Sequence, residues 1–230
     1  MDGLKEDWFE VVDALGKIIP SYNLMNRIIS LGQDIRLRKY GIGRALKPKD
    51  FVLDAGCGPG TMSEILRSMI KWEGDLVLMD SLRTMLKVSK EKFKKELSIN
   101  AIFEYLPFMN ETFDLVMCGF SFRDSLDMDS TLKEIQRILK PKGRFLLVDL
   151  GKPDNTILRF FAGVYLRYFV PFMAFLILGK KGFIYSSLYK TYKRYPTKKE
   201  LRRILQKYFH PIFFLEKMLG GAIVALYEKV

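Results

Sequence analysis

The chain has 230 residues, 49% of them hydrophobic, which is enough to build one domain with a sizeable core. Two cysteines, Cys57 and Cys118, are too few for a disulfide framework, and together with a single histidine they argue against a zinc site, so we expect a reduced, cytoplasmic protein without a metal. The net charge of +12 is concentrated between residues 180 and 207, where ten lysines and arginines accompany one acid; this indicates an anionic partner, either a membrane surface or a nucleic acid, or else a solvated helix face.

Residues 1–46 show helical spacing ahead of the first strand. Apolar positions recur at helical intervals within 4–19 and 21–30, and 32–46 forms a further helical stretch rich in arginine and lysine. Because the first ten residues are polar and acidic, rather than basic and then apolar, we expect no signal peptide. These residues are predicted to form a helical cap that can close over a bound ligand.

A short apolar strand at 50–55 runs into a glycine-rich turn, Gly56-Cys-Gly58-Pro59-Gly60. Glycines lack Cβ atoms, so the backbone can turn sharply and a ligand can lie directly against the main chain. The spacing G-x-G-x-G differs from the G-x-G-x-x-G of dinucleotide sites, which argues against a dehydrogenase. The turn is therefore interpreted as a cofactor site, with a purely structural glycine-rich turn as the alternative.

Two carboxylates flank this turn and indicate which cofactor it binds. Asp54 precedes the glycines, where it would repel a pyrophosphate and suit a cationic amino-acid moiety. Asp80 ends the next apolar run, where folds of this kind place a carboxylate on ribose hydroxyls. S-adenosylmethionine, a cationic nucleoside with a ribose, satisfies both conditions.

Between residues 47 and 150, short apolar runs alternate with helical stretches. The predicted strands cover 50–55, 75–79, 99–103, 113–119 and 144–150, and the predicted helices cover 61–71, 83–97 and 128–139. Buried strands separated by helices are typical of a mostly parallel, doubly wound sheet with helices on both faces. We therefore predict an α/β, Rossmann-like core that binds the cofactor.

Residues 151–207 form an apolar and then basic insertion. The apolar stretch 157–178 is interrupted by Arg159, Arg167 and Pro171, and its uncharged part, 168–178, is too short to span a bilayer. It is interpreted as an apolar lid or interfacial helix. Because it runs directly into the basic segment, as in interfacial anchors, we expect peripheral membrane contact through 157–207. Packing against the sheet and a homodimer contact are the alternatives.

Residues 208–230 are predicted to complete a single domain that spans 1–230. Strands are expected at 212–217 and 222–228, and Gly220-Gly221 suits a tight antiparallel hairpin between them. A hairpin that finishes an otherwise parallel sheet is consistent with the methyltransferase type of Rossmann-like fold, in which a reversed strand inserts beside the fifth strand. His210, next to Pro211, is expected to be a solvated loop residue.

Several motifs along the chain carry a family resemblance. They are Tyr22-Asn-Leu-Met-Asn-Arg27, Leu53-Asp-Ala-Gly-Cys-Gly-Pro-Gly60, Asp80-Ser-Leu-Arg-Thr-Met-Leu86, Leu106-Pro-Phe-Met-Asn-Glu-Thr-Phe-Asp114, Phe120-Ser-Phe-Arg-Asp124, Leu139-Lys-Pro-Lys-Gly-Arg144 and Gly220-Gly-Ala-Ile-Val-Ala-Leu226. With these motifs the chain resembles the C-methyltransferases of menaquinone and ubiquinone biosynthesis, which belong to the class I S-adenosylmethionine-dependent methyltransferases. The glycine turn and the Leu-Pro-Phe stretch are shared with that whole class, whereas the Tyr-x-x-Met-Asn opening, the Phe-Arg pair and the C-terminal Gly-Gly-x-x-Val-Ala are more specific to the quinone group.

The resemblance implies two sets of site residues. The implied cofactor contacts, besides Asp54, are Gly56, Gly58, Pro59, Gly60, Asp80, Ser81, Ile102, Phe103 and Gly119. Of these, Asp80 is expected on the ribose, Ile102 and Phe103 by the adenine, and Gly119 beneath the methionine portion. The residues implied to face the acceptor ring are Arg123, Asp124 and Tyr22.

The chain departs from the family pattern at two of these positions. Asp124 stands where family members usually carry Asn, and Ile102-Phe103 replaces the usual Asp-Ala pair at the adenine, so that a carboxylate there would have to come from Glu104 or from elsewhere in the chain. These departures affect the expected substrate more than the expected cofactor.

The implied reaction is methylation of a ring carbon of a lipophilic quinol, such as demethylmenaquinol. A quinol hydroxyl, with a phenol-like pKa of about 10, must lose its proton before or during attack. We expect Arg123 to act electrostatically and Asp124 to act as the base, with a surface ion pair as the alternative. Two other functions stay open: methylation of another small molecule or of tRNA, and a cofactor-binding partner protein without transfer activity.

Overall fold

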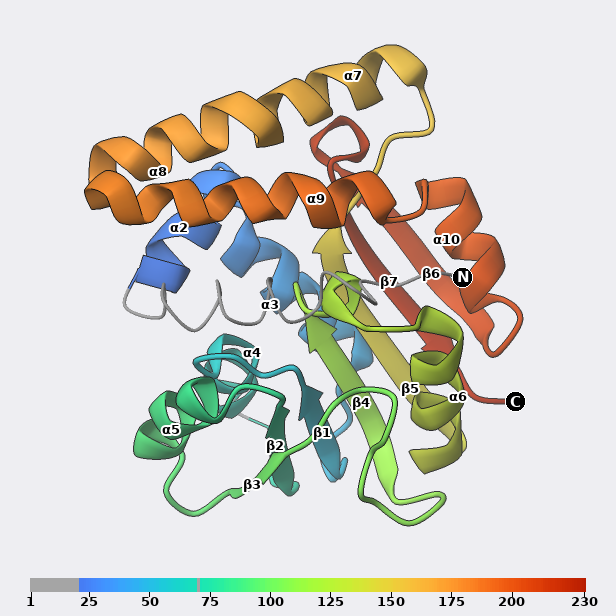
Figure 1. The fold of residues 1–230 in the computed structure, drawn as a ribbon. Helices are drawn as coiled ribbons and strands as arrows, with labels where there is room; N and C mark the ends of the chain where they lie inside the picture. The colour runs from blue at the N-terminus through green and yellow to red at the C-terminus, as the bar shows by residue number, and fades with distance from the viewer. Residues whose placement is uncertain (1–20, 70) are drawn as a thin grey trace.

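The computed structural model of this protein describes residues 21–69 and 71–230. The described residues form five parallel strands: β1 (Val52–Ala55), β2 (Leu76–Asp80), β3 (Leu97–Asn100), β4 (Phe113–Gly119) and β5 (Leu139–Leu150). Two antiparallel strands follow, β6 (His210–Lys217) and β7 (Ala222–Glu228). Together they form one seven-stranded sheet in the order β3-β2-β1-β4-β5-β7-β6 (Figure 1). The predicted α/β Rossmann-like fold and its reversed strand beside β5 are confirmed.

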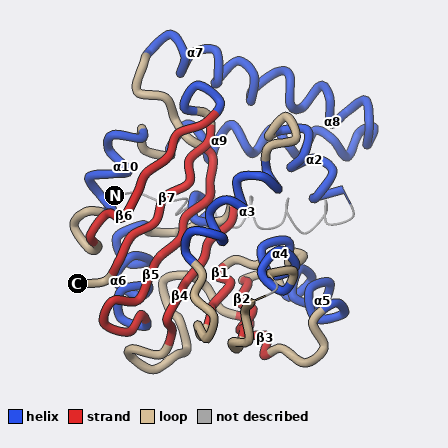
Figure 2. Tube along the Cα trace, turned by 180° about the vertical axis from the view of Figure 1, so that it is seen from behind, coloured by secondary structure: helices blue, strands red, loops and turns tan. Residues whose placement is uncertain are grey.

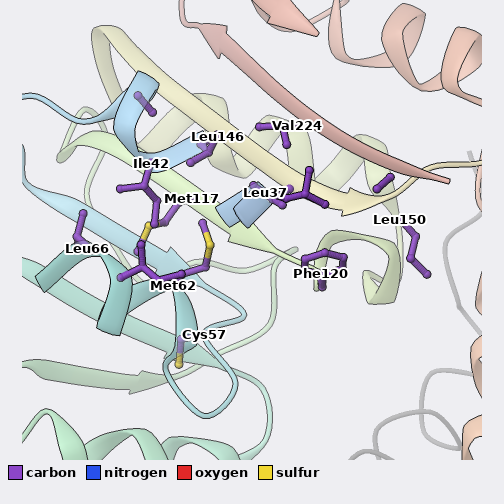
Figure 3. Close-up of a cluster of buried hydrophobic side chains, with 14 of the residues drawn as sticks. Leu37, Ile42, Cys57, Met62, Leu66, Met117, Phe120, Leu146, Leu150 and Val224 are labelled. Carbon is purple, nitrogen blue, oxygen red and sulfur yellow. The ribbon is translucent and has the colours of Figure 1, made fainter. Parts of the chain in front are cut away.

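Helices cover both faces of the sheet, because the strands alternate apolar side chains from one face to the other. On one face α2 (Tyr22–Ile29), α3 (Asp34–Ala45), α4 (Thr61–Arg67) and α5 (Arg83–Lys92) bury residues such as Ile42 and Met62 against Met117 and Leu146 (Figure 3). On the other face α6 (Met128–Ile138) and α10 (Lys198–Leu205) pack on the strand residues of a second cluster. The core is therefore two apolar layers with the sheet between them.

A pair of antiparallel helical arms lies across the end of the sheet to which β4 and β5 point (Figures 1 and 2). The first arm joins α7 (Thr156–Val164), a π-helical turn (Tyr165–Phe169) and α8 (Val170–Leu178). The second arm joins a 3₁₀ stretch (Gly179–Ser186) and α9 (Ser187–Arg194). Gly182 lies where an added Cβ would come within 2.3 Å of the Ala174 backbone, so the absence of a side chain permits the close packing of the arms. We call residues 156–194 the helical layer.

The helical layer differs from the single apolar lid or interfacial helix expected for 157–178. By length and composition alone, Thr156–Arg194 is the one helical stretch in the described residues that is apolar enough to cross a membrane. It is divided, however, by the reversal at Gly179, whose φ is +60°. Leu166, Val170 and Ala174 are buried against the body of the protein. The first arm therefore packs against the rest of the protein with one face, and the side chains on its opposite face are exposed.

Several predicted boundaries of helices and strands are wrong. The helix expected over 83–97 ends at Lys92. The strand expected over 99–103 starts at residue 97 and ends at residue 100, so Ile102 and Phe103 lie beyond it. The fifth strand starts at 139 because its register with β4 shifts between residues 113 and 115, which places the Pro141-Lys-Gly143 stretch in an irregular extension of the strand. His210 is exposed, as expected, but begins β6 instead of lying in a loop. The helix expected over 4–19 lies outside the described residues.

Candidate active site

The glycine turn joins β1 to α4 at the carboxyl edge of the parallel strands. Gly56, Gly58 and Gly60 have φ values of +68°, +54° and +87°, a left-handed conformation that favours glycine. A Cβ built on Gly56 would lie 2.6 Å from the Ser121 Oγ. The turn therefore requires glycine both for its backbone conformation and for the space beside it.

Asp80 ties this turn to the end of β2. Its Oδ2 accepts a hydrogen bond of 2.8 Å from the Gly58 N–H, and its Oδ1 accepts one of 2.9 Å from the Leu82 N–H. Burial raises the pKa of Asp80 to about 6, although these backbone hydrogen bonds lower it. The carboxylate is thus fixed in position at the mouth of the turn.

A cleft opens over the turn, and seven of the residues that the sequence proposed for the site lie along it. They are Gly56, Gly58, Asp80, Ser81, Ile102, Phe103 and Asp124. Leu82, Met85 and Phe120 complete the apolar part of its wall. Among the described residues, no lysine or arginine lines this cleft.

These walls fit S-adenosylmethionine. The side-chain-free edge of the turn admits a ligand against the backbone, and Asp80 offers a carboxylate to a ribose. The apolar side chains suit a purine, whereas a pyrophosphate would meet carboxylates without a lining cation. The chemistry of the cleft therefore matches a cationic nucleoside better than a dinucleotide.

Four other residues proposed for the cofactor do not line the cleft: Asp54, Pro59, Gly60 and Gly119. Asp54 is fully buried beneath the turn, where its Oδ2 accepts a 2.5 Å hydrogen bond from the Ser63 hydroxyl. Burial raises the pKa of Asp54 to about 6, and within the described part of the chain its Oδ1 accepts no hydrogen bond. Pro59 and Gly60 lie on the far side of the turn, where Phe93 fills the space that a Gly60 side chain would need.

Arg38, on α3, is a candidate site residue that sequence analysis treated only as one basic residue of the cap. It is 3% exposed, its Nη1 donates a 3.4 Å hydrogen bond to the Gly119 carbonyl oxygen, and its guanidinium lies 4.7 Å from the centre of the Phe120 ring. A Cβ on Gly119 would come within 2.5 Å of this Nη1. The sequence contains one signal that Arg38 is buried: at helical spacing it shares a face with Ile42 and Ala45, which are also buried.

Beyond Phe120 lies an apolar cavity of about 220 Å³ beneath the helical layer. Its walls include Leu150 at the end of β5, Tyr165 and Leu166 on the first arm, and Met218 before β7. Phe120 lines both the cleft and the cavity. Its φ of +63° is uncommon for a bulky residue, so its backbone is held in a strained conformation where the two spaces meet.

Arg123 and Asp124 lie in the 3₁₀ turn Phe122–Asp124 that follows β4, and they occupy different surroundings. Asp124 lines the cleft, and burial raises its pKa to about 6 although the nearby Arg123 charge lowers it. Arg123 lines neither space. Its Nη1 donates hydrogen bonds of 2.7 Å to the buried Asp149 and 2.6 Å to the Phe120 carbonyl oxygen, and its Nε lies 3.8 Å from Asp124 Oδ1.

Two further residues considered for the site, Tyr22 and Glu104, remain to be placed. Tyr22 begins α2, and its side chain lies outside the described part of the structure. Glu104, considered as a substitute carboxylate for adenine, lines the cleft, but its Oε1 accepts hydrogen bonds from the N–H groups of Leu126 and Asp127 and from the Thr131 hydroxyl. Glu104 therefore secures the start of α6.

Comparisons with known proteins point to one family. A model of the ubiE/COQ5 methyltransferase family matches residues 1–228. The chain is 30% identical over 204 residues to the ubiquinone/menaquinone biosynthesis C-methyltransferase UbiE of Wigglesworthia glossinidia brevipalpis, covering 86% of this chain and 81% of the relative. It is 29% identical over 223 residues to the demethylmenaquinone methyltransferase of Lactobacillus johnsonii, covering 94% and 91%.

Solved structures show the same fold at lower sequence identity. The chain matches one component of a complex between the Haloferax volcanii Trm112 methyltransferase activator and a putative methyltransferase with a TM-score of 0.65, at 16% identity over 86% of this chain and 92% of the other. It matches a SAM-dependent methyltransferase from Aquifex aeolicus with a TM-score of 0.59, at 18% identity over 90% and 98%.

Proposed function

The chain belongs to the ubiE/COQ5 methyltransferase family, and on that premise we propose that it transfers the methyl group of S-adenosylmethionine to a ring carbon of a lipophilic quinol. The observation that carries the proposal is the shared wall at Phe120: a cleft lined by carboxylates and apolar side chains that suit the cofactor opens on one side, and an apolar cavity on the other. A quinol has a polar ring and an apolar tail, so its ring belongs at Phe120 and the start of its tail in the cavity. An apolar cavity does not suit a tRNA nucleotide, the second acceptor class.

In this proposal the cofactor lies in the cleft against Gly56 and Gly58, with Asp80 and Ser81 at the ribose. Ile102 and Phe103 cover the adenine by apolar contact, in place of a carboxylate. The methionine portion extends toward Gly119, where the buried Arg38 supplies a positive charge for its carboxylate. Pro59 and Gly60 then shape the turn from behind without touching the ligand.

Asp124 is proposed as the base that removes the quinol hydroxyl proton. It lines the cleft beside Phe120, and a raised pKa of about 6 makes its carboxylate a better proton acceptor near neutral pH than an ordinary aspartate. Arg123 acts on it as a positioning residue, because Asp149 and the Phe120 carbonyl hold its guanidinium beside the Asp124 carboxylate. Bound S-adenosylmethionine would supply a methyl group whose bond to sulfur breaks as the deprotonated ring forms the new carbon–carbon bond. S-adenosylhomocysteine would leave, and loss of the proton from the methylated ring carbon would restore the aromatic ring.

The proposal extends to location. We place the protein in the cytoplasm with peripheral membrane contact through residues 157–207, because a quinol with an isoprenoid tail dissolves in the bilayer and the helical layer covers the cavity that would receive it. The apolar outer face of this layer supports membrane contact more strongly than the homodimer alternative, since two copies of a chain with net charge +12 repel each other.

The test is transfer of labelled methyl from S-adenosylmethionine to chemically reduced demethylmenaquinone, with the unreduced quinone as control. We expect label in the quinol but not in the quinone, because only the quinol has a hydroxyl to deprotonate. Calorimetry should be run alongside, to measure cofactor binding separately. Cofactor binding without label in any quinol would contradict the proposed acceptor and leave the methyl donor in place.

A further inference from the structure

A groove of about 450 Å³ lies between α7 and α9 and shares Tyr192 with the lining of the apolar cavity. Four cations line it, together with three tyrosines that face the same space. The cations are Lys152, Arg159, Arg167 and Lys193, and the tyrosines are Tyr168, Tyr189 and Tyr192. None of its lining residues, all of which are described, is acidic. We call this the basic groove.

The cations of the basic groove have few anionic partners. The Arg167 guanidinium lies 5.3 Å and 5.5 Å from the ring centres of Tyr168 and Tyr189, and within residues 21–69 and 71–230 it donates no hydrogen bond. Among the described residues, the Arg159 guanidinium donates hydrogen bonds to carbonyl and hydroxyl oxygens alone, at 3.3 to 3.5 Å. Glu200 is the acid whose charge acts on both Lys152 and Arg159, and it lies on α10. Positive charge therefore converges on a space that no described carboxylate lines.

The outer wall of the groove continues into a large exposed apolar surface on the first arm. Its most exposed members are Ile157, Phe160, Phe161, Tyr168, Phe172 and Leu176, each between 57% and 67% exposed. Phe160 and Tyr168 belong to both the groove and this surface, which we call the outer stripe. Scattered exposed apolar residues need no explanation, but a contiguous stripe of aromatic side chains marks an interaction surface.

The partner of the outer stripe must be apolar next to the stripe and anionic next to the groove. From these features we infer that the basic groove binds the phosphate of an anionic phospholipid while the outer stripe enters the adjoining acyl region. The first arm is apolar on its inner face as well as on its outer one, which is typical of a helix with an apolar medium on both sides. A second copy would bring another four cations against the groove, and RNA would offer phosphates but would leave the stripe in water.

The inference deepens the proposed function and rests on its membrane contact, to which it adds a lipid class and a site. It also gives the quinol a path. Phe161 is 62% exposed on the outer stripe and also lines the apolar cavity. With a lipid phosphate in the groove, this part of α7 faces the bilayer, so a quinol can pass from the membrane into the cavity without crossing water.

The experiment measures binding to vesicles of phosphatidylcholine alone and of phosphatidylcholine with phosphatidylglycerol. The test variant is Arg159→Gln with Arg167→Gln, and the matched control is Lys87→Gln with Lys90→Gln, which removes the same charge from the exposed face of α5. We expect the groove variant to lose at least about tenfold in binding to anionic vesicles, and the control to change less than about twofold. Arg167→Lys should retain binding, and circular dichroism with thermal melting should show that every variant is folded.

Three outcomes would overturn the inference. Equal losses in the groove and control variants would mean that net charge alone attracts the protein, and unchanged binding in the groove variant would remove the groove from the interaction. The third outcome is that the protein does not bind vesicles, but binds tRNA or inorganic phosphate, and that the groove variant loses this binding. The groove would then bind phosphate from another source.

Methyl transfer to a tail-less quinol dissolved in buffer keeps the two proposals apart. The groove variant should retain this soluble activity, because its substitutions do not line the cleft or the cavity. If the unaltered protein binds anionic vesicles through the groove but methylates no quinol, the proposed function fails while the lipid site remains.

Discussion

The cofactor cleft and the helical layer are built by different physical means. In the cleft, left-handed glycines and buried carboxylates are held by short hydrogen bonds to backbone groups, as between Gly58 and Asp80. In the helical layer, the hydrogen bonds that the Tyr165 hydroxyl donates to the Ile28 and Ile29 carbonyl oxygens are long, at 3.3 and 3.4 Å, and apolar packing predominates. The function of the cleft therefore depends on the positions of individual atoms, whereas the function of the layer depends mainly on the volume and polarity of its side chains. Single substitutions should accordingly reduce ligand binding and activity more in the cleft than in the layer.

The largest effect is expected at the glycine turn. In Gly56→Ala the new methyl group would lie 2.6 Å from Ser121 Oγ in a backbone with φ of +68°, so the turn must move and cofactor binding should fall below detection in calorimetry. The matched control is Gly43→Ala on the exposed side of α3, where an added Cβ meets no atom within 4 Å. That variant should bind normally and gain about 1 kcal/mol in stability. Normal binding by Gly56→Ala would contradict the assigned cofactor site.

The second effect concerns Asp124, whose side chain lines the cleft but does not determine the backbone conformation of the glycine turn. Asp124→Asn should slow methyl transfer by about a hundredfold at saturating cofactor, because an amide cannot accept the hydroxyl proton. In the unaltered protein the rate should rise as pH increases through about 6, where Asp124 loses its proton, and in the variant this rise should disappear. A rate and pH profile unchanged by the substitution would exclude Asp124 as the base.

The same substitution should raise stability, which a merely structural ion pair would not do. Because burial raises the folded-state pKa of Asp124 from 3.8 to about 6, ionisation of this group costs stability as pH rises through that interval. Asp124→Asn should therefore be more stable at pH 7 by about 3 kcal/mol, and the gain should vanish below pH 4.

Asp114→Asn serves as the control with the opposite sign. Partial burial alone would raise the pKa of Asp114, but the hydrogen bond from Lys140 lowers it below its ordinary value. Loss of this carboxylate should reduce stability at neutral pH, and the difference should shrink as pH falls. Chemical denaturation at pH 4 and pH 7 measures both variants.

A third, smaller effect tests whether the cavity holds the acceptor. Ala162→Phe places a ring in the apolar cavity and should raise the KM for the quinol by about tenfold while leaving the dissociation constant of the cofactor unchanged. Gly163→Ala is the neighbouring control, since its new Cβ would lie no closer than 3.7 Å to Tyr189. An equal loss of cofactor affinity in Ala162→Phe would mean that the cleft and the cavity are not separate sites.

The smallest effect is expected on the outer stripe. Phe172→Ser removes one of many exposed apolar side chains, so vesicle binding should weaken by only about twofold and activity on a soluble quinol should not change. Comparison of vesicle binding with activity on the soluble quinol shows whether the residues of the outer stripe contribute about equally to membrane binding. A large loss of soluble activity would show that the helical layer specifies individual side chains in the same way as the cleft.

The contrast between the two regions also explains what the sequence could predict. The alternation of apolar runs and helices, together with the Gly220-Gly221 turn, was sufficient for the sheet and for its reversed strand. The glycine spacing and Asp80 located the cleft, because strand ends meet at one edge of a parallel sheet. These predictions depend on short-range patterns that backbone geometry converts directly into position.

The remaining features depend on contacts between distant parts of the chain. Arg38 reaches the Gly119 carbonyl across 81 positions, and Arg123 pairs with Asp149 instead of facing an open pocket. Helical periodicity could place Arg38 on a buried face but could not identify its partner, and no local spacing distinguishes Arg123 from a solvated arginine such as Arg36. The apolar cavity could not be predicted either, since its walls come from five separated segments that meet only in the folded protein.

The position of β7 has a consequence for how the protein is made. A ribosome delivers this strand after every other strand of the sheet, yet it lies between β5 and β6 and is buried along nearly its whole length. Until β7 arrives, the edge of β5 that ends at Asp149 and Leu150 has no neighbour to pair with. The nascent chain can assemble its cofactor half early, but the antiparallel pairing of β5 and the part of the cavity wall formed by Ala222 must wait for residues 222–228, so translation products that lack these residues should be targets for chaperones and proteases.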